Sequence, residues 1–182
     1  MPHLPDELWL HILAYLPPAD IWRTLHPLSR QLSACTEDYL VSPHCSNVLS
    51  RFTVGHQFSL SSGSHHRWYD VRGTITFTFK GISKHNARYA WFGSYLVHPQ
   101  RCNARAMEEW KRMSERGVSG RQEWRVQFGY DGDVRLVRLP KLVLLAGEEG
   151  VWVDWREMFD AYFAPKADEE GARQVVWSSR AN

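Results

Sequence analysis

The stretch LPDELWLHILAYLP, residues 4–17, is apolar on nearly every side when it is wound into a helix. Pro5 suits the first helical turn, and His11 is the only polar residue in the range 8–16. Successive residues lie about 100° apart around the axis, so the apolar side chains cover most of the circumference. Such a helix is buried on several sides, and a module of about 45 residues cannot supply that cover alone. The stretch therefore predicts a helix, ending near Leu16, that needs a surface from outside its own module.

Two more short helices are expected, which makes residues 1–45 a three-helix module. The second helix spans about residues 18–25, and the third follows Pro27, which disfavours helical geometry at the residue before it. The apolar positions at helical spacing are Ile21, Trp22 and Leu25 in the second helix and Leu28, Leu32 and Cys35 in the third.

Beyond about residue 46 the hydrophobic period becomes that of strands. Residues 74–79, TITFTF, alternate polar and apolar side chains, which is typical of a half-buried antiparallel strand. Further strands are expected at residues 52–60, 89–97, 123–128, 134–139, 142–145, 151–155 and 174–177. Many short strands joined by turn residues are typical of a β-sandwich or jelly roll.

Helices are also expected within this second domain, one at residues 103–117 and a shorter one after Trp155. The polar tail after Pro165 is expected to be partly loose. The predicted fold class is therefore α+β. A three-helix module over residues 1–45 precedes a mainly antiparallel β-sandwich or jelly-roll domain, with one or two helices, over residues 46–182.

The composition limits the classes of function. The formal net charge is +2, and acidic residues dilute the basic stretch 101–125, which argues against nucleic-acid binding. Three cysteines without a CxxC pair fit a reducing compartment better than a disulfide framework. The first residues lack the features of a signal peptide, and no apolar run approaches the roughly 18 residues of a membrane helix. We therefore expect a soluble protein of the cytoplasm or nucleus, with neither nucleic acid nor membrane as a partner.

Residues that could carry chemistry form no catalytic or metal-binding pattern. His65-His66 would point to opposite faces of a strand, and no HxxxH motif or acidic cluster accompanies them. Cys102 has no activating pattern around it, and residues 129–132 are not followed by the GK[ST] of a phosphate-binding loop. We expect no catalytic residue, no metal site and no cofactor.

The amino end resembles the F-box over about residues 4–41. The matching segments are Leu4-Pro5-Asp6-Glu7-Leu8, Ile12-Leu13-Ala14-Tyr15-Leu16-Pro17, Ala19-Asp20-Ile21 and Leu28-Ser29-Arg30, in the order and spacing of that family. Pro27 and Leu32 depart from the family pattern, where the last two helices join.

This resemblance implies docking on a Skp-type adaptor, which bridges to a cullin scaffold and its RING subunit. Carried over position by position, the docking residues are Leu4, Pro5, Leu8, Ile12, Leu13, Leu16, Ile21, Leu25 and Leu28. The implied protein is a non-catalytic substrate-recognition subunit of an SCF-type ubiquitin ligase. Three alternatives remain: a non-degradative lectin-like or protein-binding module that uses the F-box only for adaptor contact, an enzyme with an unrecognised site, and docking residues that merely form a helical core.

The second domain is similar to phloem-lectin (Nictaba-like) domains in three places, residues 68–75, 89–97 and 152–159. This similarity implies a β-sandwich descended from a glycan-binding module, which takes either a sugar or a protein, including a glycoprotein substrate.

Aromatic and Arg side chains suit such a ligand surface, because they offer flat apolar faces beside polar groups. The expected ligand residues are Trp68, Arg72, Trp91, Trp152 and Trp155. Trp152 and Trp155 are three residues apart at the end of a strand, so at most one of them should face inward. The alternative is that all five are buried.

Overall fold

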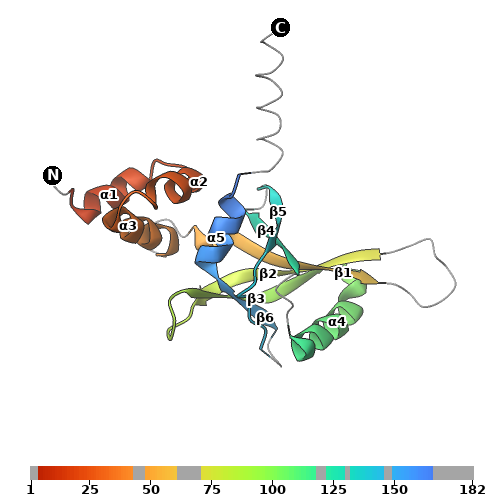
Figure 1. Ribbon diagram of the computed structural model, residues 1–182. Coiled ribbons are helices and arrows are strands. Elements are labelled where there is room, and N and C mark those ends of the chain that lie inside the picture. Colours follow the sequence, from red (N-terminus) through yellow and green to blue (C-terminus); the bar gives the residue numbers. More distant parts are fainter. Residues whose placement is uncertain are drawn as a thin grey trace, which may run out of the picture.

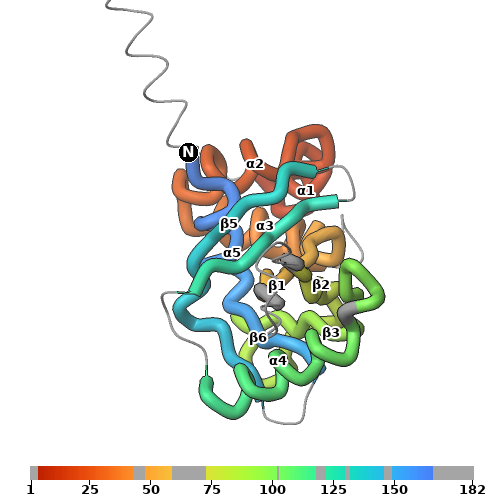
Figure 2. Tube along the Cα trace, turned by 90° about the vertical axis from the view of Figure 1, so that its right-hand side faces the viewer, coloured from red at the N-terminus to blue at the C-terminus, as the bar shows by residue number. Residues whose placement is uncertain are grey.

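The computed structural model describes residues 4–42, 48–60, 71–117, 122–129, 132–145 and 149–165. The amino-terminal helices lie at one end of a curled sheet, and α5 (Trp155–Phe163) lies between them and the sheet (Figure 1). Helix α4 (Asn103–Arg116) lies at the opposite end of the molecule (Figure 2). The α+β fold class is confirmed.

The amino-terminal segment contains four short helical elements. They are α1 (Asp6–Leu13), α2 (Pro18–Asp20), its π-helical continuation η1 (Ile21–Leu25) and α3 (Arg30–Val41). The first helix ends at Leu13, earlier than expected. The N–H groups of Tyr15 and Leu16 turn back to carbonyls three residues before them, at 3.1 Å each, which tightens the last turn.

Helix α3 begins later than the sequence indicated. The side chain of Ser29 accepts a hydrogen bond from the backbone N–H of Leu32 at 3.1 Å, so Ser29 is the N-cap. Leu28 therefore lies in the turn before the helix, and its assignment to the third helix was wrong.

The strands form one six-stranded sheet in the order β5-β4-β1-β2-β3-β6, and every neighbouring pair is antiparallel. The strands are β1 (Phe52–Leu60), β2 (Val71–Ile82), β3 (Tyr89–His98), β4 (Glu123–Phe128), β5 (Val134–Arg138) and β6 (Gly150–Asp154). Two short 3-10 turns, η2 (Leu49–Arg51) and η3 (Gln100–Cys102), precede β1 and α4.

The expected β-sandwich differs from this arrangement, because the described strands lie in one sheet that packs against helices rather than against a second sheet. The strand expected at 142–145 is reduced to a single bridge between Val143 and Trp152. The last strand ends at Asp154, whose carboxylate accepts from the N–H of Glu157 at 3.3 Å and caps α5. The strand expected at 174–177 lies outside the described residues.

Helices α4 and α5 cover the same face of the sheet. Val54 lies directly opposite Phe77, and Phe52 is two residues from Val54, so all three point to one face. The Trp110 ring of α4 lies 4.6 Å from Phe77, and the Phe159 ring of α5 lies 5.0 Å from Phe52. The other face of the sheet carries no described helix.

Candidate functional site

An apolar surface is exposed on the amino-terminal helices. Leu8, Ile12 and Tyr15 follow one another at spacings of four and three residues, which places them on one side of α1 and its last turn. Their exposed fractions are 48%, 42% and 89%, and that of Leu28 is 64%. The side chain of Gln31 donates to the carbonyl of Leu4 at 2.9 Å, so the start of α3 lies beside the start of α1. We call Leu8, Ile12, Tyr15 and Leu28 the docking face.

The nine residues expected to contact an adaptor differ in how exposed the structure leaves them. Leu13 and Ile21 are fully buried inside the chain, so their assignment to a docking surface is corrected. Leu13 was misplaced because an all-apolar helix gives no sequence signal that separates the side facing its own domain from the side facing a partner. Pro5 is exposed, whereas Leu4, Leu16 and Leu25 are half-buried. Tyr15 was missed, although its spacing from Leu8 and Ile12 could have identified it.

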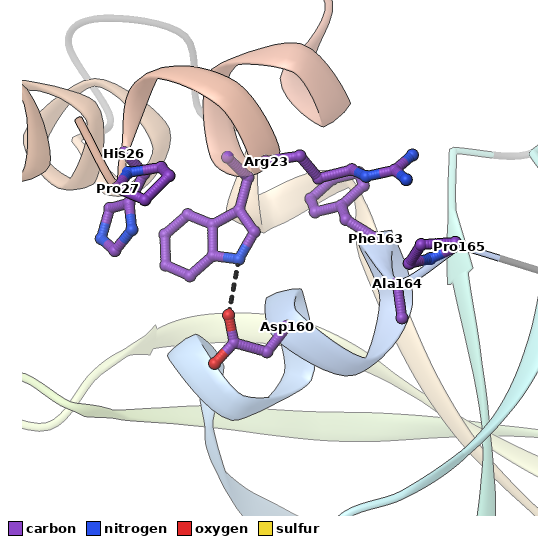
Figure 3. Close-up of a pocket in the computed structure, with 8 residues that line it drawn as sticks. Arg23, His26, Pro27, Asp160, Phe163, Ala164 and Pro165 are labelled. Atoms are coloured by element: carbon purple, nitrogen blue, oxygen red, sulfur yellow. Dashed lines mark hydrogen bonds between the residues drawn. The ribbon is translucent and has the colours of Figure 1, made fainter.

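Trp22 joins the amino-terminal helices to α5. Its indole N–H donates to the Asp160 carboxylate at 2.9 Å (Figure 3). The ring stacks on His26, with centroids 4.2 Å apart, and meets Phe159 edge-on at 5.2 Å. These contacts bury Trp22 to 5% exposure, although it comes from the amino-terminal module and Phe159 from the carboxy-terminal one.

A second link runs across the same junction. Arg156 of α5 donates from Nη2 to the Glu37 carboxylate of α3 at 2.6 Å. A pocket of about 330 Å³ lies between the two parts and is lined by Trp22, Arg23, His26, Pro27, Asp160, Phe163, Ala164 and Pro165 (Figure 3). The buried rings of Trp22 and Phe159, together with the Trp22–Asp160 and Arg156–Glu37 contacts, connect the amino-terminal helices to α5.

The predicted aromatic ligand set is only partly brought together. Trp91 and Trp152 lie opposite each other on β3 and β6, and their half-buried rings are 5.1 Å apart. Trp155 is 3% exposed and donates its indole N–H to the Ala87 carbonyl at 2.8 Å, so its place on a ligand surface is corrected. It opens α5, which turns the ring into the core. Trp68 and the Arg72 side chain lie outside the described part of the structure.

A groove of about 210 Å³ lies on the uncovered face of the sheet. It is lined by Thr53, Gly55, Thr74, Thr76, His98, Arg125, Gln127 and Val134. Sequence reasoning missed it. The available signal was the TITFTF alternation itself, because its Phe side chains fill the core and its Thr side chains must line the opposite face. We call this the open-face groove.

Two titratable groups, the half-buried His56 and the buried Cys35, have shifted pKa values. Burial lowers the pKa of the His56 imidazole, while the negative charge of Glu109 acts in the opposite direction. Burial raises the pKa of the Cys35 thiol, and a hydrogen bond with the Asp6 side chain adds to that effect. Both shifts favour the neutral form of the group.

The described residues hold neither a candidate metal site nor a candidate membrane-spanning helix. No group of three or more His, Cys, Asp and Glu side chains there could hold a metal ion. Over the same part of the chain, each helix is too short or too polar to cross a membrane.

Comparison with known proteins gives one match. Residues 1–26 match the family model of the F-box domain. Neither a curated protein nor a solved structure matches the chain. The resemblance of the second domain to phloem lectins thus stays a prediction, whereas the resemblance of the amino end to the F-box is confirmed by the match at residues 1–26.

Proposed function

We propose that the protein is a non-catalytic substrate-recognition subunit of an SCF-type cullin–RING ubiquitin ligase. Its F-box docks on a Skp-type adaptor, and its sheet domain binds a protein or glycoprotein target. The observation that carries this proposal is the F-box match at residues 1–26, since F-box domains bind Skp-type adaptors within SCF complexes.

The docking face supports the adaptor contact physically. Leu8, Ile12, Tyr15 and Leu28 are large apolar side chains that the chain leaves 42% to 89% exposed. A group of large exposed apolar side chains is typical of a protein–protein contact, because burying them against a partner removes them from water. A partner with an apolar groove would complete the cover that the first helix needs.

The junction supports the receptor role. A ubiquitin ligase receptor has to hold its target at a defined place relative to the adaptor. The Trp22–Asp160 hydrogen bond and the Arg156–Glu37 ion pair link the F-box to α5, which packs on the sheet through Phe52 and Phe159. One continuous core therefore connects the adaptor side to the target side.

The target surface proposed from the sequence keeps Trp91 and Trp152, whose rings are half-buried on the open face of the sheet. A glycan array and a pull-down from cell extract, run in parallel on the wild-type protein and on Trp91→Ala and Trp68→Ala variants, separate a sugar ligand from a protein ligand. Loss of the same ligand in both variants, with the thermal unfolding midpoint unchanged, supports this surface.

Adaptor docking is tested by co-expression with a Skp-type adaptor. Replacing Leu8 and Ile12 together with Asp places two charges in the contact, and we expect binding to weaken by about 100-fold or more. The matched control is Leu145→Asp, because Leu145 is 42% exposed, as Ile12 is, but belongs to the segment between β5 and β6. Adaptor binding that survives the double substitution contradicts the proposal.

The ligase role is tested separately. With cullin and RING subunits added, ubiquitin should be transferred to proteins that co-purify with the wild-type chain, and the transfer should be lost in the double variant. Adaptor binding without any such transfer would identify a non-degradative binding module instead.

A further inference from the structure

The uncovered face of the sheet carries an ordered row of side chains across five strands. The pairing registers place Leu136, Arg125, Gly55, Thr76 and Leu96 side by side on β5, β4, β1, β2 and β3. Paired residues point to the same face, and this face is opposite to Val54 and Phe77, which pack in the core. Across the sheet, the row therefore consists of an apolar residue, a cationic residue, a glycine, a hydroxyl residue and a second apolar residue.

The open-face groove passes over Gly55, which lies at the centre of this row and has no side chain. A side chain would be crowded at this position, because a Cβ atom there would lie 3.2 Å from the Ile75 carbonyl and 3.4 Å from the Thr76 hydroxyl. Thr53, Thr74 and Thr76 line the open-face groove together with Gly55, and the Thr76 hydroxyl is the one that lies beside Gly55. The face thus carries three Thr side chains beside a glycine, and the Thr76 hydroxyl is available as a hydrogen-bond donor.

Arg125 is the charged group of the groove, and among the described residues no acidic side chain pairs with it. Glu123, the nearest acid along the same strand, lies 4.0 Å from the guanidinium of Arg138. His98 lies opposite Thr74 at the other side of the groove and can donate from its ring. Arg125 is half-buried and has no acidic partner among the described residues, and such a guanidinium favours an anionic ligand.

We propose that the open-face groove binds a carboxylate of an acidic, extended segment of the target protein, with Arg125 as the ion-pair partner and the Thr76 hydroxyl as a donor. One guanidinium in the groove matches the single charge and two oxygens of a carboxylate. Phosphoryl groups are bound by clusters of Arg, which this groove lacks within the described residues. Leu96 and Leu136, 69% and 59% exposed, provide apolar contacts at the two ends of the row.

The row also sets the length of the bound segment. Leu96 and Leu136 are four strand spacings apart, which is about 19 Å at about 4.8 Å per spacing. An extended chain covers that distance in about six residues at about 3.3 Å each. The matching probe is a fluorescein-labelled heptapeptide with leucine at both ends and five aspartates between them. Peptides with five serines, five lysines or a central phosphoserine among serines are the comparisons.

This inference deepens the proposed function, because the acidic segment belongs to the target that the receptor would recruit. Its test does not require the adaptor. Fluorescence anisotropy of the labelled peptides on the full chain measures the groove directly, and the adaptor pull-down measures the docking face. The Leu8→Asp and Ile12→Asp double variant should lose the adaptor and keep the peptide, and Arg125→Gln should show the reverse. The two proposals can therefore fail independently.

We expect the wild-type chain to bind the aspartate peptide. Arg125→Gln should weaken this binding by about tenfold or more, and Arg105→Gln should leave it unchanged. Arg105 is an exposed Arg on α4, which covers the opposite face of the sheet, so it is a matched control for the change of charge. Arg125→Glu should instead bind the lysine peptide, a gain that misfolding cannot produce. Thr76→Val should weaken the aspartate peptide while the lysine peptide stays unbound.

Three results would overturn the proposal. Equal binding of the serine and aspartate peptides would remove the role of charge. Binding of the phosphoserine peptide alone would assign the groove to phosphoryl groups. The chain also carries its own acids at Asp168, Glu169 and Glu170. If the aspartate peptide binds only after these three are replaced by Asn, Gln and Gln, the occupant is the chain's own tail.

Discussion

Trp22 and Asp160 offer a direct measurement of how firmly the F-box is joined to the sheet domain. Trp22→Phe removes the N–H donor but keeps a ring in the site, whereas Asp160→Ala removes the acceptor. A hydrogen bond to a charged acceptor contributes about 1.5–3 kcal/mol, but Asp160 is exposed and water competes for it. We therefore expect a contribution of about 1 kcal/mol from this bond.

The two single variants and the double variant form a double-mutant cycle. The smaller Phe ring also costs packing, but that cost is independent of Asp160 and cancels in the cycle. Chemical unfolding in urea, followed by far-UV circular dichroism, gives the three changes in the free energy of unfolding. Each change of about 1 kcal/mol corresponds to a shift of about 2–4 °C in Tm for a chain of this size.

The control is the exposed pair of Arg112 and Glu108, four residues apart on α4 with a 2.6 Å contact. Arg112→Ala should change stability by less than about 0.5 kcal/mol, because exposed ion pairs of this type contribute little. A coupling energy between Trp22→Phe and Asp160→Ala below about 0.3 kcal/mol would refute the reasoning. It would show that the indole hydrogen bond does not tie the F-box to α5 in solution.

Three further outcomes follow from burial. Leu13→Ala should lower the free energy of unfolding by about 2–5 kcal/mol, whereas Leu8→Ala, at a half-exposed position, should cost less than about 1 kcal/mol in urea unfolding. Because the pKa of His56 is lowered in the folded state, the unfolded state binds more protons, so stability should be full above about pH 6.5 and fall as the pH drops below it. His56→Gln should flatten that fall in pH-dependent unfolding, and the exposed control His85→Gln should leave it unchanged. Cys35, 5% exposed and with a raised pKa, should react with a thiol reagent only as the chain unfolds; rapid reaction of the folded protein would contradict its burial.

The sequence by itself determined the features that depend on motif order and on the spacing of apolar residues along the chain. The apolar helix and its motif order at residues 4–30 predicted the F-box, and the family model confirms it. The alternation at residues 74–79 predicted a strand that lies inside β2, and β1 and β4 have the predicted bounds, Phe52–Leu60 and Glu123–Phe128. These features were readable because helical and strand periods depend only on local geometry.

Only the tertiary structure decided how these elements face one another. Leu8 and Leu13 are equally apolar, yet one is 48% exposed and the other is fully buried, because only packing distinguishes the sides of an apolar helix. Arg125 and Thr76 are 49 positions apart, and the strand order brings them to one groove. Trp155 became a core residue because Asp154 ends the strand and starts a helix. The docking face, the junction and the open-face groove therefore all depend on contacts between segments that are distant in the chain. The spacing of apolar residues within one segment does not predict such contacts.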